Sequence, residues 1–242
     1  MKPALVLSDL HLSATRPAAV DAFHAFARGP AKQASSVYIL GDLFDWWLGD
    51  DQLADPLAAS VAASIRSISD SGVPVFFARG NRDFLLGERF EKATGARLLP
   101  EQHLVALAGI PTLLLHGDEL CTSDVEYQRY RARIRTPHAA RRLLALPYFL
   151  RRVIAWYLRR KSSAANALKP ESIMDVSDDA VADAFRRHAV VRMVHGHTHR
   201  PARHAHAVDG LTCERVVLAD WHDRGHYLEI DETGMREREV DP

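Results

Sequence analysis

Short apolar runs alternate with longer amphipathic stretches along most of the chain, and this alternation limits the fold more than any other feature. Strands separated by helices are typical of an α/β protein. The runs that we expect to be buried strands are 2–8, 37–41, 73–79, 112–116 and 191–195. The antiparallel strands that we expect to pack beside them are 103–108, 203–208, 215–218 and 226–231. The pattern therefore predicts an α/β fold with two sheets.

Length and composition fit one domain. The chain has 242 residues, of which 47% are hydrophobic and 26% charged, and an α/β protein of this size often forms a single core. We expect one domain over 1–242. The chain contains no run of the roughly 18 apolar residues that a membrane-spanning helix needs and no secretory signal, so we expect a cytoplasmic protein. Cys121 and Cys213 are too few for a disulfide framework, and we expect buried thiols.

The net charge of zero conceals a strongly basic segment. Between Arg129 and Lys161 the chain carries eleven basic residues and no Asp or Glu. Such a segment either has an anionic partner or forms solvated basic helices, and its charge leaves both open. A capping box at 123–126 and a Thr-Pro pair at 136–137 indicate helix starts. We therefore predict a basic, amphipathic helical insertion over about 123–170.

The last basic stretch of this insertion has helical periodicity. Apolar side chains recur at helical spacing at Leu150, Val153, Ile154, Tyr157 and Leu158. The basic residues expected to lie away from that apolar face are Arg151, Arg152, Arg159 and Arg160. The spacing predicts an amphipathic helix, and the following residues, 162–166, are expected to form a loop.

Candidate metal ligands stand at the end of each of the five predicted buried strands or just after it. They are, in strand order, Asp9 and His11, Asp42, Asn81, His116, and His197 with His199. Each motif alone is a weak signal, because an Asp-x-His or a Gly-Asp usually serves a turn or a helix cap. The carboxyl ends of strands in an open α/β sheet form one rim, so we expect all seven side chains to meet there.

The ligand types favour two metal ions. Three Asp or Asn side chains and four imidazoles exceed the four ligands of a structural zinc site and suit two ions that share a carboxylate. Nitrogen and oxygen ligands without thiolate favour manganese, iron or zinc, and the spacing does not choose among them. Two such ions about 3.5–4 Å apart polarise a phosphoryl oxygen and lower the pKa of a water. The expected chemistry is phosphoester hydrolysis.

The ligand motifs together resemble those of the calcineurin-like metallophosphoesterases. This resemblance implies an α/β/β/α sandwich, two sheets between helical layers, here with the helical insertion as a cap. Longer stretches resemble the UDP-2,3-diacylglucosamine diphosphatases of lipid A biosynthesis. These stretches are SDLHL at 8–12, YILGDLFDWWLGDD at 38–51, GNRDFLLG at 80–87, HGDE at 116–119 and HGHTHRP at 195–201.

The resemblance also implies the role of each site residue. One manganese ion would take Asp9, His11, Asp42 and His199, and the other Asp42, Asn81, His116 and His197, with Asp42 bridging. The catalytic group would be Asp42, Asn81, Arg82 and His116. The implied substrate contacts are Asn81, Arg82, Asp124, Ser162, Asn166, Lys169 and His197. A shift of one residue would exchange Ser162 for Ser163.

Arg82 separates this chain from the protein phosphatases of the same family, which carry a histidine there. A guanidinium holds a diphosphate by paired hydrogen bonds but does not donate a proton at pH 7. The resemblance therefore implies hydrolysis of UDP-2,3-diacylglucosamine to UMP and 2,3-diacylglucosamine 1-phosphate, by metal-activated water attacking the α-phosphorus. The alternatives are another dinuclear phosphoesterase acting on a nucleotide, or a non-catalytic lipid-binding protein.

The expected partners follow from substrate and charge. The lipid substrate and the basic helices predict peripheral binding to the anionic cytoplasmic face of the inner membrane. Nucleic acid is not expected, because the basic helices carry an apolar stripe in place of a face that tracks phosphates. We infer no obligate protein partner.

Overall fold

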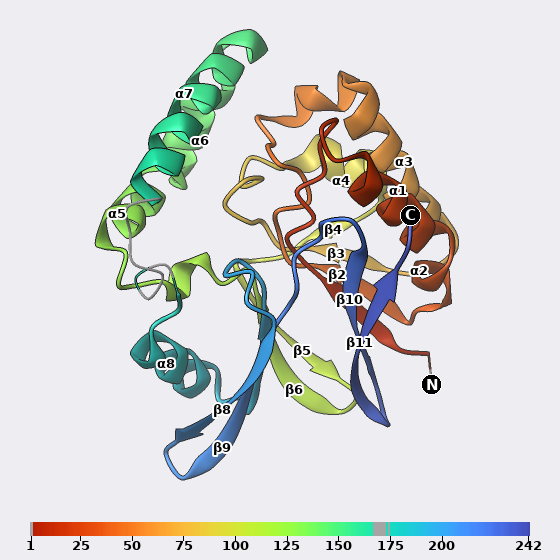
Figure 1. Ribbon diagram of the computed structural model, residues 1–242, viewed down its shortest axis with the longest axis vertical. Coiled ribbons are helices and arrows are strands. Elements are labelled where there is room, and N and C mark those ends of the chain that lie inside the picture. The colour runs from red at the N-terminus through yellow and green to blue at the C-terminus, as the bar shows by residue number, and fades with distance from the viewer. Residues whose placement is uncertain (1, 167–172, 174) are drawn as a thin grey trace.

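The chain folds as two β-sheets packed face to face between helices (Figure 1). The computed structural model describes residues 2–166, 173 and 175–242, without the side chains of 159 and 161–166. This layering confirms the predicted α/β class with two sheets.

The first sheet has 6 strands in the order β11-β10-β1-β2-β3-β4. Its strands are β1 (Ala4–Leu7), β2 (Ser36–Ile39), β3 (Val75–Phe77), β4 (Arg97–Leu98), β10 (Gly225–Asp231) and β11 (Gly234–Val240). The strands β1 to β4 are parallel, and β10 and β11 continue the sheet in antiparallel pairs.

The second sheet has 5 strands in the order β5-β6-β7-β9-β8. Its strands are β5 (Gln102–Leu107), β6 (Ile110–Leu115), β7 (Arg192–His195), β8 (Ala202–Val208) and β9 (Leu211–Val217). The inner strands β6, β7 and β9 are parallel, and the two edge strands are antiparallel to their neighbours.

Helices cover the outer face of each sheet. Over the first sheet lie α1 (Pro17–Arg28), α2 (Pro30–Gln33), α3 (Pro56–Asp70) and α4 (Glu88–Thr94), and over the second lies α8 (Asp178–His188). Two short 3₁₀ turns, η1 (Asp50–Ala54) and η2 (Asp118–Leu120), follow β2 and β6.

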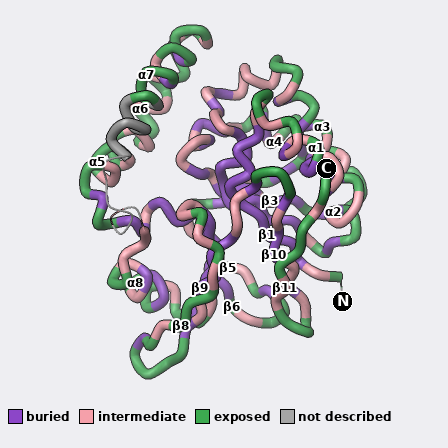
Figure 2. Tube along the Cα trace, viewed as in Figure 1, coloured by how far each residue is buried: buried purple, intermediate pink, exposed green. Residues whose placement is uncertain are grey.

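Three apolar layers hold the sandwich together. In β1, Leu5 and Leu7 pack toward the helices of the first sheet, whereas Val6 packs between the two sheets. Successive strand residues point to opposite faces, so a strand covered on both sides is apolar throughout. The third layer joins the second sheet to α8 through residues such as Met193 and Phe185. The core strands are accordingly buried along their length (Figure 2).

All nine predicted strands are present, but their division between the sheets differs from the prediction. The five strands expected to be buried are split between the sheets, and β9 is parallel to β7 instead of antiparallel. The sequence pattern did not indicate β4 or β11. The former has only two residues, and the latter alternates Arg and Glu at a sheet edge, where one side is open to water.

The segment expected to be a helical insertion forms three helices that extend from the sandwich (Figure 1). They are α5 (Val125–Ile134), α6 (Pro137–Leu144) and α7 (Tyr148–Asn166). We call these three helices the cap. The loop predicted over 162–166 is wrong, because α7 continues through Asn166. Within the described residues, no helix is both long and apolar enough to cross a membrane.

One basic residue of α7 contradicts the predicted amphipathic pattern. Arg151 was expected to lie away from the apolar face, yet it is buried and pairs with Asp51, and it also donates to the carbonyl of Leu48. Its charge therefore joins α7 to the segment that follows β2. Meanwhile Phe149 and Trp156 on the same helix remain largely exposed. Both cysteines are buried, as predicted.

Candidate metal centre

The seven predicted ligands lie on loops that follow β1, β2 and β3 of the first sheet and β6 and β7 of the second. The expected single rim is therefore two rims facing each other. Hydrogen bonds join them: the backbone N–H of His197 donates to Asp9 Oδ2 at 2.8 Å, and His116 Nδ1 lies 2.8 Å from the carbonyl oxygen of Leu40. The sandwich thus brings ligands from both sheets together.

Five of the seven ligand residues have a backbone conformation that L-residues rarely adopt. The φ angles are 56° at Asp9, 48° at His11, 53° at Asp42, 68° at His197 and 53° at His199. A left-handed conformation costs a non-glycine residue roughly 1–3 kcal/mol and persists only where the surroundings hold it. Such strain clusters at functional sites, so it supports a common function for these loops.

Two glycines permit the close approach of the ligand loops. A Cβ atom at Gly80 would collide with the carboxylate of Asp42, and one at Gly196 would collide with that of Asp9. Only glycine leaves room for both carboxylates to face the centre.

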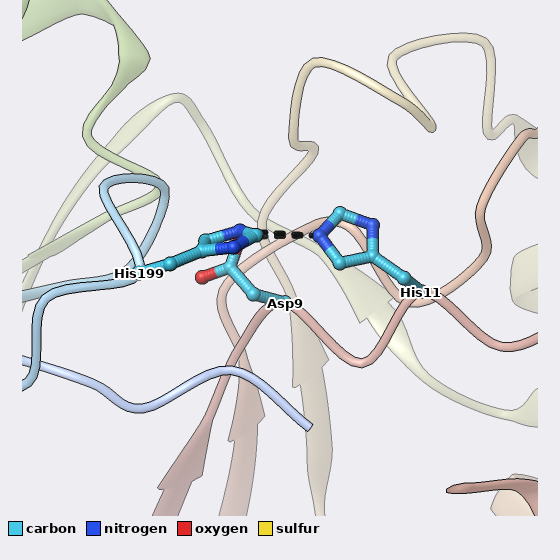
Figure 3. A group of neighbouring side chains, drawn as sticks. All are labelled: Asp9, His11 and His199. Atoms are coloured by element: carbon cyan, nitrogen blue, oxygen red, sulfur yellow. Dashed lines mark hydrogen bonds and ion pairs between the residues drawn. The ribbon is translucent and has the colours of Figure 1, made fainter. Parts of the chain in front are cut away.

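The first group of ligands comprises Asp9, His11 and His199 (Figure 3). His11 Nε2 lies 3.2 Å from His199 Nε2, and Asp9 Oδ1 lies 3.4 Å from His199 Nε2 and 3.9 Å from His11 Nε2. Asp9 is fully buried, and its Oδ1 atom makes no hydrogen bond of good geometry. A buried acceptor without a donor is costly, and a cation among these three atoms would satisfy it.

The second group surrounds Asp42. Asp42 Oδ1 lies 3.7 Å from His116 Nε2, and Asn81 Oδ1 lies 2.9 Å from both His116 Nε2 and His197 Nδ1. A carbonyl only accepts, so His116 donates to Leu40 from Nδ1 and leaves Nε2 facing the amide oxygen of Asn81. In the neutral ring Nε2 is an acceptor, and so is Asn81 Oδ1, so this pair of atoms needs a proton or a cation between them.

Asp42 reaches both groups. Its Oδ2 atom lies 3.9 Å from His11 Nε2 in the first group, while Oδ1 faces His116 in the second. The backbone N–H of Arg82 donates to Oδ1 at 2.8 Å and fixes the carboxylate. Carboxylate, amide and imidazole are the ligands that divalent transition metals accept, so these residues fit divalent metal ions.

Burial keeps two of the imidazoles neutral, as metal ligation requires. Burial lowers the pKa of His11 to about 4. Burial and the charge of His116 lower the pKa of His197 to about 3. For His199, burial lowers the pKa, but its interactions with Asp220 and Asp9 outweigh this effect and raise the pKa to about 10. A metal ion at His199 therefore has to displace a proton.

The carboxylates respond to their shared burial in opposite ways. Burial and the nearby Asp9 charge raise the pKa of Asp42, against the opposing effect of His116. Burial also raises the pKa of Asp9, but His199 and His116 outweigh it and leave the pKa well below its usual range. Without a bound cation, imidazole protons would have to balance the two buried carboxylates.

The residues predicted to contact substrate are placed unevenly. Arg82 is partly exposed, and its backbone N–H donates to Asp42 Oδ1 at the metal centre. Asp124 is buried and caps α5 by accepting a hydrogen bond from the Tyr127 backbone at 3.1 Å. The backbones of Ser162 and Asn166 belong to α7, but the structure does not describe their side chains. Lys169 lies outside the described residues.

Sequence reasoning missed a buried ionic network that joins the cap to the metal centre. Asp118, two residues after His116, accepts hydrogen bonds from Arg131 at 2.8 Å and Arg135 at 2.9 Å. Arg135 also donates to the carbonyl of Gly80, beside Asn81, at 2.9 Å. Both arginines belong to the basic segment for which an outside partner was one possibility, and here their partner is internal. The only sequence signal was an acidic residue in HGDE.

Tyr127 of α5 completes this contact. Its hydroxyl donates to Asp118 at 2.6 Å, and its ring stacks on that of His197 with centroids 6.2 Å apart. The first cap helix is therefore in direct contact with a candidate ligand.

The fold and the candidate centre together define a metal-dependent phosphoesterase of the calcineurin-like type. Residues 2–201 match the sequence profile of the calcineurin-like phosphoesterases, and the chain belongs to that family.

More specific relatives cover nearly the whole chain. It is 46% identical over 226 residues to the UDP-2,3-diacylglucosamine hydrolase of Escherichia coli O81 (strain ED1a), covering 93% of this chain and 94% of the relative. It is 45% identical over 237 residues to the protein of that name from Cellvibrio japonicus (strain Ueda107), covering 98% of each chain. A solved archaeal phosphodiesterase aligns with a TM-score of 0.48 at 10% identity, covering 99% of each chain.

Removal of divalent cations should lower the thermal midpoint, because the bound ions offset carboxylate repulsion and backbone strain. A ligand present at 100 times its Kd raises the free energy of unfolding by about 2.7 kcal/mol. For a domain of this size that corresponds to a rise in the thermal midpoint of roughly 5–10 °C. Calorimetry of chelator-treated protein with and without added manganese measures this shift. The Asp42→Ala variant should lose most of it, and a wild-type midpoint indifferent to manganese contradicts the assignment.

Proposed function

We propose that the chain hydrolyses the diphosphate bond of UDP-2,3-diacylglucosamine, giving UMP and 2,3-diacylglucosamine 1-phosphate, a reaction of lipid A biosynthesis. The observation that carries the proposal is the convergence of seven candidate ligands in a chain about 46% identical to proteins named for this substrate. Arg82, in place of the histidine of protein phosphatases, supports a diphosphate substrate.

The ligands divide into two sites in this proposal. Asp9, His11, Asp42 and His199 hold one ion, and Asp42, Asn81, His116 and His197 hold the other. We propose manganese for both. When bound, the two ions supply Lewis-acid polarisation of a phosphoryl oxygen and a water of lowered pKa. Asp42 is the shared ligand because its two oxygens face different groups.

The chain's own residues position the diphosphate. The backbone N–H of Arg82 donates a hydrogen bond to the carboxylate of Asp42, so the Arg82 side chain extends from a point beside the metal centre. There it binds phosphoryl oxygens by paired hydrogen bonds and stabilises the charge that develops on them. Water attacks the α-phosphorus and loses its proton to solvent, the bond to the bridging oxygen breaks, and the sugar phosphate leaves in line. A phosphate leaving group needs no proton, so the reaction does not require a proton donor at the position of Arg82.

The cap accounts for the lipid part of the substrate. On α7, Phe149, Val153, Trp156 and Tyr157 are each more than half exposed. Burying one methylene contributes about 0.8 kcal/mol, so acyl chains placed against these side chains bind favourably. The network of Asp118, Arg131 and Arg135 fixes the cap beside the metal centre. The headgroup and the chains are thus bound by adjacent parts of one protein.

The same cap is proposed to attach the enzyme to the cytoplasmic face of the inner membrane. Arg141, Arg142 and Arg152 are exposed on α6 and α7, close in sequence to the exposed apolar residues. A basic residue near an anionic lipid surface contributes about 1 kcal/mol, screened by salt. The enzyme is then a cytoplasmic protein that binds the membrane peripherally.

Replacing Asp42 with alanine should lower kcat at least about a thousand-fold, equivalent to about 4 kcal/mol, because both ions lose their shared ligand. The assay is UMP release from the diacyl substrate with saturating manganese, with metal content measured in parallel. Asp21→Ala, an exposed change on α1, serves as the control with wild-type turnover. Wild-type activity in metal-replete Asp42→Ala would refute the assignment.

Hydrolysis in oxygen-18 water should place the label in UMP, because water attacks the phosphorus attached to uridine. Mass spectrometry of both products after a single turnover gives the answer. Label in the sugar phosphate would mean attack on the other phosphorus and would overturn the proposed orientation of the substrate.

Anionic vesicles should bind the protein in a salt-dependent manner. The double change Arg141→Gln with Arg142→Gln should weaken binding at low salt by about 2 kcal/mol, roughly 30-fold. Arg89→Gln with Arg97→Gln removes equal charge from exposed positions outside the cap and should have little effect. Sedimentation that ignores salt, or equal losses in both double variants, counts against membrane attachment through the cap.

A further inference from the structure

We propose that Asp220 is a positioning residue of the metal centre, whose carboxylate orients His199 so that Nε2 faces the cation. This inference rests on the proposed role of His199 as a ligand. It adds a residue that the ligand motifs do not contain, since Asp220 lies in the segment after β9 and not after β1, β2, β3, β6 or β7.

The two nitrogens of His199 have different partners. Nδ1 lies 3.2 Å from Asp220 Oδ2, while Nε2 lies 3.4 Å from Asp9 Oδ1 and 3.2 Å from His11 Nε2. A carboxylate only accepts hydrogen bonds, so Nδ1 carries the proton and donates to Asp220. In the neutral ring this leaves the lone pair on Nε2, the atom that points at Asp9 and His11. Metal-binding histidines commonly have a carboxylate or carbonyl behind them in this way.

His116 provides an internal comparison. Its Nδ1 donates to the carbonyl of Leu40, and its Nε2 faces the second group of ligands. Its side chain is only 2% exposed, however, whereas that of His199 is 38% exposed. Packing alone therefore constrains His199 far less, and a hydrogen bond from a fixed partner has more effect on its orientation.

Asp220 is itself held firmly. Next to it, Trp221 is fully buried, and its backbone N–H donates to the carbonyl oxygen of Asp9 at 3.1 Å. The indole N–H of Trp221 donates to the carbonyl of His226 at 2.7 Å, and its ring packs on Phe23 and Phe26. One short segment thus contacts Asp9 through its backbone and His199 through a side chain.

A second contact fixes the carboxylate from the solvent side. His222 Nε2 lies 2.9 Å from Asp220 Oδ2, and His222 Nδ1 lies 3.0 Å from a guanidinium nitrogen of Arg16. Arg16 also donates to the carbonyl of Trp221. The side chain of Asp220 is 14% exposed, so its carboxylate is largely removed from solvent while it contacts His199 and His222.

The test compares manganese binding by chelator-treated variants, measured by titration calorimetry together with metal content after gel filtration. Asp220→Ala should raise the Kd of one ion about 10–100-fold. Asp220→Asn keeps an oxygen that accepts from Nδ1 and should have a smaller effect. Asp223→Ala, an exposed neighbour, should bind as wild type. The thermal midpoint of the metal-free protein should change little in Asp220→Asn.

Two results separate this inference from the proposal on which it rests. If His199→Ala weakens manganese binding and Asp220→Ala does not, the positioning role is overturned while the metal centre stands. If His199→Ala itself binds manganese as wild type, the metal centre fails as well. Should Asp220→Ala not fold, Asp220→Asn decides: a Kd raised severalfold with an unchanged metal-free midpoint supports positioning, and an unchanged Kd overturns it.

Discussion

Buried acceptors that face one another are the constraint on which the rest of the structure depends. Asp9 and Asp42 are almost completely removed from water and both lie close to the imidazoles of His11 and His116. Each carboxylate loses its hydration on burial, and their mutual repulsion adds to that cost. Only protons or cations offset it. The strained backbone of five ligand residues is a further cost that a bound cation helps to balance.

The sandwich is the device that imposes this arrangement. Parallel strands in both sheets end at one edge of the molecule, and the apolar layers on either side of β1 and β7 hold these ends in place. The ligand loops need no rigidity of their own, because each starts from a buried strand. The cap is tied to the same loops by Arg135 and Gly80, so the proposed lipid-binding part and the metal centre are mechanically joined.

Much of the fold and of the candidate site follows from local sequence. Strand and ligand occur together, as in Ser8 to His11, so a short motif predicts both. The sheet to which a strand belongs depends on pairing between distant segments, which explains why the five strands expected to be buried are divided between two sheets. A count of charges does not say which residues pair, so the pairing of Arg131 with Asp118 and of Arg151 with Asp51 could not be predicted from the sequence. A single Asp after a strand usually serves a turn, so the sequence alone offers no reason to select Asp220. Only its short distance to His199 in the structure indicates a role at the metal centre.

Anomalous diffraction from crystals grown with manganese, with data collected at the manganese edge, tests the central claim most directly. The account predicts two peaks about 3.5–4 Å apart, one among Asp9, His11 and His199, the other among Asn81, His116 and His197, with Asp42 between them. A single peak, or peaks at another place on the molecule while these side chains still point at one another, would contradict it.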